Sequence, residues 1–401
     1  METSTPDTEA PNPASSNLPR NVRVLGVVSL VNDVASEMVF PLLPNFLLVF
    51  LGGNKIWLGL IEGLADTTGS LLKLVAGGWS DRAGKRKGFV LFGYSLAVFA
   101  RPLIGILTAP WQLLLVRFSD RIGKGVRTAP RDALIADSVP AGQRGRAFGF
   151  HQAMDHLGAA LGPLLAFAFL WAWPDSLRTL FLWTIVPGII VLVLLLFGLR
   201  EPPAKEPAKE PMQWTLKPFS RGFRWLLLSL VVFTLGNSSD AFLLIRAQEL
   251  GVEIHWLPIL WCVYHLAKSG GNWLLGRAVD RFGARRFILG GWFVYAGLYL
   301  AFGLATQAWH AWAFFLAYAI FYSLTEPAEK TLIASLAGKE RKGLAFGWYN
   351  AAIGIAALPS SILFGTIYQQ WGAFAAFAWG ASLGLIAAAI LACIPMHPPT
   401  D

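Results

Sequence analysis

The sequence predicts an all-α membrane protein of twelve transmembrane helices, arranged as two pseudo-symmetric six-helix bundles. Three observations carry this prediction: a membrane-like composition, long apolar stretches at regular spacing, and a motif that recurs after half the chain length. Hydrophobic residues make up 55% of the 401 residues and charged residues only 14%, whereas soluble domains carry roughly 25% charged residues. Such a composition indicates a protein whose surroundings are mostly lipid.

Twelve stretches are each long and apolar enough to cross a hydrocarbon core of ~30 Å, which takes about 20 helical residues. They run near 22–50, 56–77, 88–107, 111–136, 147–170 and 177–199, and then near 222–250, 255–277, 287–305, 309–336, 344–370 and 372–395. Between the halves, the run EPPAKEPAKEP excludes a spanning helix because of its prolines and charges. We therefore expect bundles over 21–200 and 222–396, a cytoplasmic linker over 201–221, a disordered cytoplasmic tail over 1–20 and a short tail over 397–401.

Basic residues concentrate in alternate loops, such as 82–87, 144–146, 281–286 and 339–342. The positive-inside rule places these loops and both termini in the cytoplasm, which predicts a multi-pass protein of the inner membrane. The net charge of +9 follows from this topology, so the lipid bilayer is an expected partner and nucleic acid is not. Cys262 and Cys393 stand far apart in apolar stretches, so neither a disulfide nor a zinc site is expected.

A motif in the first half recurs in the second. Residues 77–87 read GGWSDRAGKRK and residues 276–286 read GRAVDRFGARR, a displacement of 199 positions, and the tripeptide LIA recurs with a displacement of 198. Two distant markers that agree to within one residue indicate duplication of a six-helix unit. Because six is an even number, both copies are expected to cross the membrane in the same direction.

The repeated Gly-x-x-x-Asp-Arg-x-Gly pattern, placed in short basic loops, resembles the signature loop of the major facilitator superfamily. Arg117 with Gly123 and Gly125 resembles the fourth-helix motif of that family, with Arg121 where a glycine is usual. Residues 120–132 look like those of a little-characterised, drug-efflux-like prokaryotic subgroup. The resemblance covers the chain apart from its tails and linker, and implies the major facilitator fold.

The fifth stretch contains Gly158, Gly162 and Pro163, which resemble the family's fifth-helix motif associated with antiporters. Ala166 and Phe167 replace the glycine pair with which that motif usually ends, and this weakens the inference of antiport. Glycines at this spacing also let any helix approach a neighbour closely.

The resemblance further implies that the loop residues form a gating latch, a charge network that holds the halves together in one state and releases them in another. These residues are Gly77, Asp81, Arg82, Gly84, Arg86, Asp137, Gly276, Asp280, Arg281 and Gly283. Simple anchoring by positive charge is the alternative. It explains the arginines but not the aspartates or the glycines.

Ionisable residues inside the apolar stretches predict a polar cavity. Each would cost about 2.5–3.5 kcal/mol against lipid, so together they must face one another or water. The proton-coupling candidates are Asp33, Glu37, Glu62, Asp66 and His265, and the substrate-binding candidates are Arg117, Arg121, Lys124, Arg127, Asn237 and Asp240. In the alternative interpretation, paired ions only fix how the helices pack.

Motifs of nucleotide hydrolysis, hydrolase catalysis, metalloproteases and dinucleotide binding are missing from the sequence. We therefore expect a monomeric secondary transporter, driven by gradients, rather than an enzyme, with no cofactor and no metal. The leading prediction is alternating-access, proton-coupled efflux of a small anionic or zwitterionic organic solute. Two alternatives stay open: proton-coupled uptake of an organic anion or metal chelate, and a ligand receptor that transports nothing.

Overall fold

The computed structural model describes residues 18–83, 85–140, 143–201, 215–217, 219–337 and 342–393. All regular structure in these ranges is helical, which confirms the predicted fold class. By length and hydropathy, seven of the described helices or helical runs qualify as membrane spans. The remaining long helices are α3 (Lys55–Ala83), α5 (Pro110–Asp137), α11 (Leu257–Phe282) and α13 (Ala308–Leu336). Their polar and charged side chains lower their hydropathy, and these side chains build the site described below.

The first half contains α3, α5 and the helices around them. The first apolar stretch forms α1 (Arg20–Glu37), η1 (Phe40–Leu42), α2 (Leu43–Asn45) and η2 (Phe46–Phe50). It breaks after Glu37 because Pro41 and Pro44 cannot donate the backbone hydrogen bonds of a continuous helix. The others are α4 (Lys87–Leu103), η3 (Ile104–Ile106), α6 (Arg144–Ala172), α7 (Leu177–Trp183), α8 (Ile185–Val193) and η5 (Leu194–Gly198).

The second half contains α11, α13 and five further elements: α9 (Arg221–Gly236), α10 (Ala241–Glu249), η6 (Ile254–Trp256), α12 (Ala284–Leu304) and α14 (Lys342–Cys393). Residues 237–240 separate α9 from α10. Within α14 the chain turns at Gly372, whose φ of 84° suits glycine, so α14 consists of two helical legs.

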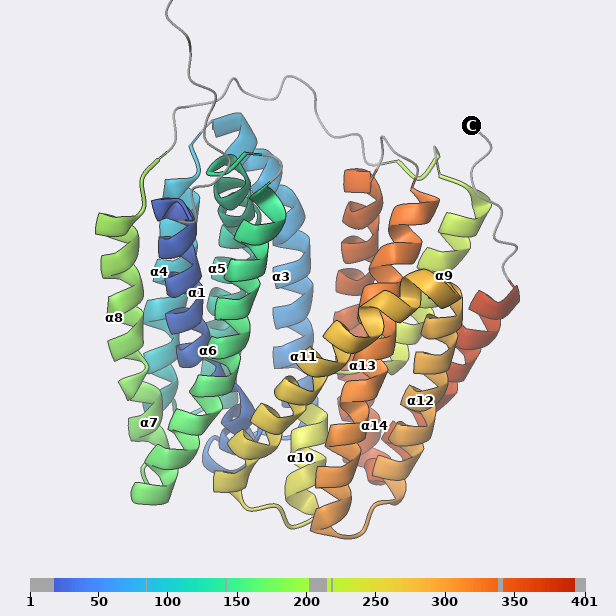
Figure 1. Ribbon diagram of the computed structural model, residues 1–401. Helices are drawn as coiled ribbons and strands as arrows, with labels where there is room; N and C mark the ends of the chain where they lie inside the picture. The colour runs from blue at the N-terminus through green and yellow to red at the C-terminus, as the bar shows by residue number, and fades with distance from the viewer. Residues whose placement is uncertain are drawn as a thin grey trace, which may run out of the picture.

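Both halves cross the molecule in the same direction, as predicted from the repeat. At one end Arg20 donates to the carbonyl groups of Phe197 and Gly198 in the first half. At the corresponding end of the second half, Arg285 donates to Leu391 and Ala392. We call this end, where α1 and α9 both begin, the basic end; it is uppermost in Figure 1.

The opposite end, called the far end, is where the halves meet. Lys55 at the start of α3 forms an ion pair of 2.7 Å with Glu249 at the end of α10. The Tyr368 hydroxyl donates to the same glutamate, and its ring lies below the Lys55 ammonium group. The ribbons accordingly converge at the far end and separate toward the basic end (Figure 1).

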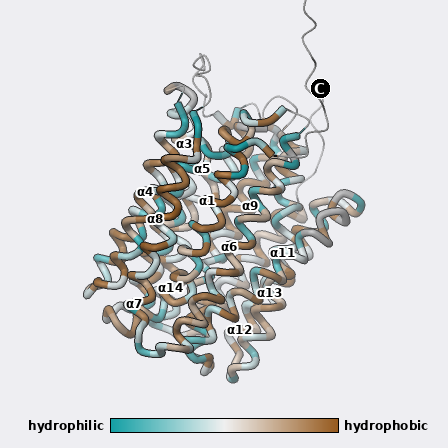
Figure 2. The backbone as a smooth tube through the Cα atoms, turned by 60° about the vertical axis from the view of Figure 1, so that its left-hand side comes forward, coloured by the Kyte–Doolittle hydropathy of each residue, from teal (hydrophilic) through white to brown (hydrophobic). Residues whose placement is uncertain are grey.

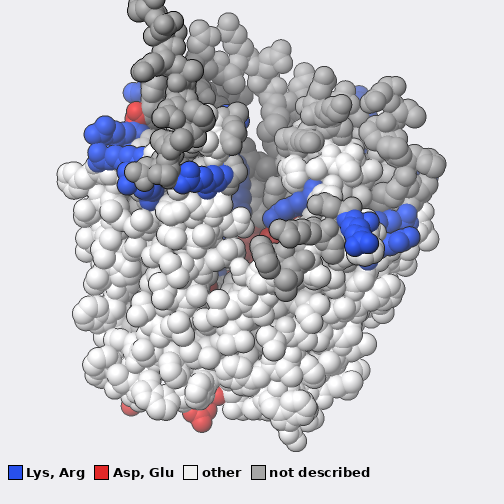
Figure 3. Space-filling model, viewed as in Figure 1, with Lys and Arg blue, Asp and Glu red and all other residues white. Residues whose placement is uncertain are grey.

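The outer surface between the ends is apolar. Hydrophobic residues run along the helices in Figure 2, and hydrophilic ones concentrate toward their ends. Large apolar side chains point outward, among them Phe197, Leu304 and Trp371. In Figure 3 the visible flank is almost free of charge, with Lys and Arg near the basic end. This surface suits contact with lipid, so the internal charges must be accommodated elsewhere.

Small residues let α3 and the first leg of α14 pack closely across the interface between the halves. Gly63 lies against the backbone of Leu358, and Gly354 lies against Ser70. The Thr67 hydroxyl donates to the Gly354 carbonyl oxygen at 2.6 Å. Recurrent small residues at a spacing of four permit such backbone contact between membrane helices.

We expect Gly59→Leu to prevent closure of the far end. A Cβ atom at Gly59 would run into the carbonyl group of Ser361, and that backbone oxygen cannot move aside without separating the two helices. Overpacking of this kind costs about 1–3 kcal/mol. Alkylation of cysteines introduced at the far end should therefore become faster. Gly78→Leu on the same helix is the control, because no atom lies within 4 Å of its added Cβ; equal alkylation in both variants would contradict the prediction.

Candidate functional site

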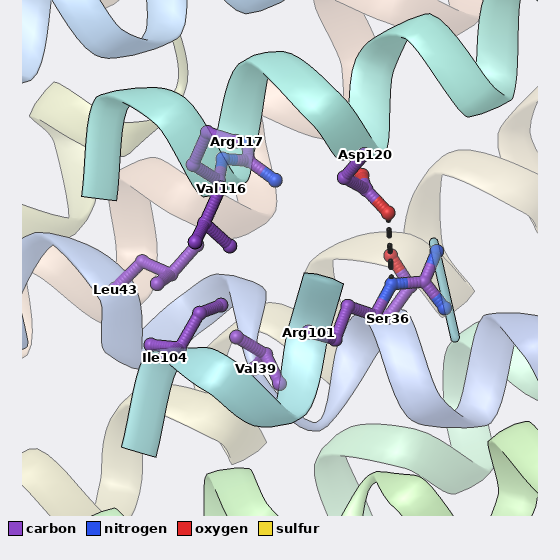
Figure 4. A pocket seen from close by; sticks show the side chains of 8 residues that line it. All are labelled: Ser36, Val39, Leu43, Arg101, Ile104, Val116, Arg117 and Asp120. Atoms are coloured by element: carbon purple, nitrogen blue, oxygen red, sulfur yellow. Dashed lines mark hydrogen bonds and ion pairs between the residues drawn. The ribbon is translucent and has the colours of Figure 1, made fainter. Parts of the chain in front are cut away.

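Two buried ion pairs hold α5 against its neighbours. Arg117 on α5 donates three hydrogen bonds of 2.8–3.0 Å to Glu62 on α3. Asp120, one turn further along α5, accepts from Arg101 on α4 at 3.0 Å, and Arg101 also donates to Asn32 on α1. Figure 4 shows Arg101 and Asp120 facing each other across a small pocket that Arg117 also lines.

These pairs change the interpretation of two candidates. The sequence assigns Glu62 to proton coupling and Arg117 to substrate binding, but the structure pairs the two side chains with each other. Their exposed fractions are only 3% and 6%. Here the arrangement favours the alternative in which paired ions fix helix packing.

Arg127 also points away from the interface between the halves. Its guanidinium group lies 4.3 Å from the centre of the Tyr94 ring and donates to the Gly93 carbonyl oxygen at 3.3 Å. Gly93 and Gly123 bring α4 and α5 close enough for this contact, because a Cβ at either position would meet the other's carbonyl oxygen. Arg127 therefore belongs to the packing between α4 and α5.

A second group of charges on the first half has no ion pair. Lys73, Arg121 and Lys124, which we call the basic patch, form no salt bridge with any residue that the structure describes. The Nε atom of Arg121 is buried without a hydrogen-bond partner. Lys124 is exposed although it lies midway along α5, and its strongest electrostatic neighbours are Arg121, Lys73 and Asp33.

The basic patch borders a hollow between the halves. Lys124 interacts with charges on α1 and α3 as well as on its own helix, so its exposed face looks into the protein interior rather than outward to lipid. Figure 3 shows a hollow that opens at the basic end, with Lys, Arg and acidic side chains on its walls. This is the arrangement that the cost of charges in lipid demands.

Two carboxylates face the same region. Asp33 on α1 accepts one hydrogen bond of 2.9 Å, from Asn32. Asp66 on α3 has no hydrogen bond or ion pair with the described part of the chain, and its nearest strong charges include Arg121 and Lys124. Within the described chain, neither of these proton-coupling candidates forms an ion pair, whereas Glu62 does.

The wall contributed by the second half is lined by tyrosines around Asp240. The break after α9 exposes Asn237 and Asp240 to these tyrosines, and the Tyr318 hydroxyl donates to Asp240 at 3.0 Å. Lys268 on α11 lies 3.9 Å from the centre of the Tyr322 ring and 3.4 Å from Glu326. Asp66 of the first half lies within electrostatic range of Asp240.

Sequence reasoning missed these tyrosines. Tyr295 and Tyr299 lie four residues apart on α12, and Tyr318 and Tyr322 lie four apart on α13. This spacing puts each pair on one face of its helix, a signal that was available from the sequence. The two pairs meet because α12 packs against α13, and Tyr299 and Tyr318 approach to 6.2 Å between ring centres.

One hydrogen bond joins the halves at the inner end of the hollow. The indole nitrogen of Trp261 on α11 donates to a carboxylate oxygen of Glu37 on α1 at 2.8 Å. His265, one turn further along α11, packs against the Trp261 ring at 4.7 Å, and its Nε2 atom is buried without a partner. The sequence analysis singled out Glu37 and His265, but not Trp261, whose side chain contacts both.

The predicted latch is only partly described. Arg86 at the start of α4 forms an ion pair with Asp137 at the end of α5, so this contact lies within the first half. Gly77 contacts Ala129 on α5, Arg281 stacks on Phe282, and Gly283 turns the chain between α11 and α12 with a φ of 90°. Gly84 and the side chains of Asp81, Arg82 and Asp280, together with position 276, lie outside what the structure describes. Gating by these loops stays a prediction.

The fifth-helix glycines form a close contact with α1. A Cβ at Gly158 would lie 2.5 Å from the Leu30 carbonyl oxygen, and one at Gly162 would lie 2.6 Å from that of Val34. Pro163 follows directly and lies inside α6. This contact places Asp33 and Glu37 beside α6, so the motif also positions the acidic candidates.

The family model for the Major Facilitator Superfamily matches residues 25–264 and 242–401. The chain belongs to the Major Facilitator Superfamily. Because members of this family are transporters, the protein is a multi-pass membrane transporter of small solutes rather than an enzyme.

The chain is also similar to two curated relatives and to a solved structure that shares its fold. An uncharacterized transporter of this superfamily from Methanocaldococcus jannaschii is 29% identical over 386 residues, covering 95% of this chain and 96% of the relative. The multidrug resistance protein MdtH of Salmonella newport is 24% identical over 353 residues, 84% of each chain. A bacterial homologue of the human lysosomal transporter Spinster, in an inward-facing and occupied conformation, has a TM-score of 0.73 at 18% identity, covering 92% of this chain and 95% of that one.

Proposed function

We propose that this protein is a proton-coupled secondary transporter that exports a small anionic or zwitterionic organic solute by alternating access. The observation that supports it best is the basic patch: Lys73, Arg121 and Lys124 face the hollow without a salt bridge in the described chain. The three basic groups outnumber the two carboxylates near them, Asp33 and Asp66. Excess positive charge is unfavourable away from bulk water, and an anion that enters the hollow relieves it. A lipophilic cation would be repelled there.

The opposite wall supports a solute with a second polar group. Asp240 and Glu326 supply negative charge, and Tyr322 and Lys268 are partly exposed beside them. A zwitterion can place its anionic group at the basic patch and its cationic group near Asp240. Binding across both halves would let the solute bias the rocking of one bundle against the other.

The distribution of charge orients the two ends of the protein in the membrane. We place the basic end in the cytoplasm of the cell, and the far end outside, because Lys and Arg gather near the basic end. The hollow is then open to the cytoplasm and the far end is closed, an inward-open state in which both termini are cytoplasmic. The similarity to a multidrug resistance protein and the fifth-helix motif favour efflux.

Transport is tested with purified protein in liposomes of bacterial lipids. A panel of metabolites and drugs, first screened for thermal stabilisation, is loaded on one side while an internal dye reports pH. Solute movement with opposite proton movement supports exchange, and movement in the same direction supports the alternative of uptake. Binding with no flux under either gradient would instead support a receptor.

Asp33→Asn and Asp66→Asn are expected to remove the dependence of transport on a pH gradient. Each asparagine keeps the size of the side chain but cannot bind or release a proton, so a residue that carries the coupled proton cannot be replaced in this way. Solute flux should persist without a gradient, while the dye response driven by the solute should be lost. Glu253→Gln, exposed at the far end, is the control. Full coupling in both aspartate variants would exclude these residues.

A further inference from the structure

We propose that the hydrogen bond between Trp261 and Glu37 is a proton-controlled lock that keeps the far end closed while Glu37 is ionised. This inference rests on the proposed function for its role in coupling, but the lock itself concerns only the two bundles. The geometry carries it: the donor and the acceptor belong to different halves, 224 positions apart in sequence, and are 2.8 Å apart in space.

The lock lies where the hollow ends and the closed part of the interface begins. Trp261 has an exposed fraction of 5%, and its ring packs 5.0 Å from that of Phe40, just after the break in the first helix. One residue along α11, the Cys262 sulfur contacts the Ala160 carbonyl oxygen on α6. Toward the far end, His255 and Trp256 pack against Phe167 of α6. Trp261 thus stands at the inner edge of the surface that must separate when the far end opens.

Ionisation of Glu37 controls the strength of this contact. A hydrogen bond from an indole N–H to a carboxylate is roughly twice as strong as one to a neutral acceptor. The structure describes no other hydrogen-bond donor to Glu37, so the carboxylate depends on Trp261 and on nearby charge. When Glu37 takes up a proton, the link between the halves weakens and the second half is freer to rock away.

Charged groups surround Glu37. Its basic neighbours are Lys124 and Arg121 on α5 and Arg101 on α4, and Asp33 lies one turn before it on the same helix. On α11, His265 lies against the Trp261 ring, and on α6, Asp155 acts on Asp33.

This arrangement meets a requirement of coupled exchange. A carrier that holds neither proton nor solute must not reorient, because reorientation in that form dissipates the gradients. The ionised Glu37 holds the empty carrier closed at the far end. Proton uptake at Glu37 removes the charge that strengthens the lock, so loading releases it.

The lock is tested by distances between spin labels at the far end, measured in lipid nanodiscs across a pH series. Labels are placed at Asp175 and Thr306, which are exposed at the far end of the two halves, in a background carrying Cys262→Ser and Cys393→Ser. In the parent, acidification should raise the ratio of open to closed far ends by about tenfold, the factor given by 1.4 kcal/mol.

Two variants remove the lock in different ways. Trp261→Phe deletes the donor but keeps a ring against Phe40, and Glu37→Gln keeps an acceptor but cannot ionise. In both variants the ratio of open to closed far ends should stay high at every pH. Glu329→Gln is the matched control, because that carboxylate accepts from Tyr349 within the second half; its pH response should equal the parent's.

An unchanged pH response in Trp261→Phe would overturn the proposal, as would a Glu37→Gln protein that stays closed. A folded state is verified for each variant by its elution as a single species and by its thermal transition. Solute and proton flux are recorded separately in liposomes. Flux without pH-dependent distances would contradict the lock alone, and pH-dependent distances without flux would contradict the transport function alone.

Discussion

Glu62→Ala is expected to destabilise the protein by about 3–5 kcal/mol, the largest effect on stability of any substitution considered. The change leaves Arg117 charged in a buried site, with its three hydrogen bonds to Glu62 lost. Water cannot replace them easily, because the arginine has an exposed fraction of only 6%. The midpoint of thermal unfolding in detergent, followed by tryptophan fluorescence, should fall sharply.

A double variant distinguishes the contribution of the ion pair from the cost of leaving one buried charge unpaired. The double variant Glu62→Leu with Arg117→Met removes both ions and fills similar volume, so it should recover most of the lost stability. Glu253→Gln, whose side chain is 73% exposed, should leave the transition unchanged. A single variant as stable as the parent would show that the pair contributes nothing to the packing of α3 on α5.

Arg121→Gln is expected to have the largest effect on the solute. Arg121 belongs to the basic patch and has no ion pair within the described chain. A hydrogen bond to a charged group contributes about 1.5–3 kcal/mol, which corresponds to roughly 10- to 150-fold in affinity. Binding of the screened solute should weaken by that factor in equilibrium dialysis or calorimetry, while the unfolding midpoint changes little.

Arg127→Gln is the matched comparison on the same helix. Its guanidinium group lies over Tyr94 and bonds to Gly93, so its replacement should lower the unfolding midpoint and leave solute affinity as in the parent. The opposite pattern, with affinity lost at position 127 and kept at 121, would mean that the solute occupies a different part of the interior.

The relation between prediction and structure differs from residue to residue. The helical periodicity of the fourth apolar stretch places four of the substrate-binding candidates, Arg117, Arg121, Lys124 and Arg127, within one arc. The structure divides them: Arg117 pairs with α3, Arg127 packs on α4, and the two between them face the hollow. Helix spacing gives the direction of a side chain around its own axis, but not which neighbour stands there.

By itself, the sequence determined the membrane class, the two-bundle repeat and the family. These follow from local properties: apolar length, positive charge in loops, and a motif repeated at half length. The cost of placing charged side chains in lipid also requires a polar interior, whatever the detailed packing of the helices.

Only the tertiary structure decided which charged side chains form ion pairs between packed helices and which are left without one. Glu62 and Arg117 form an ion pair with each other, whereas Asp66 and Arg121 form none with the described residues. Glu37 accepts a hydrogen bond from a tryptophan of the other half. Pairing depends on which helices become neighbours and at what depth. Those contacts join residues up to 224 positions apart, a separation that no local pattern in the chain encodes.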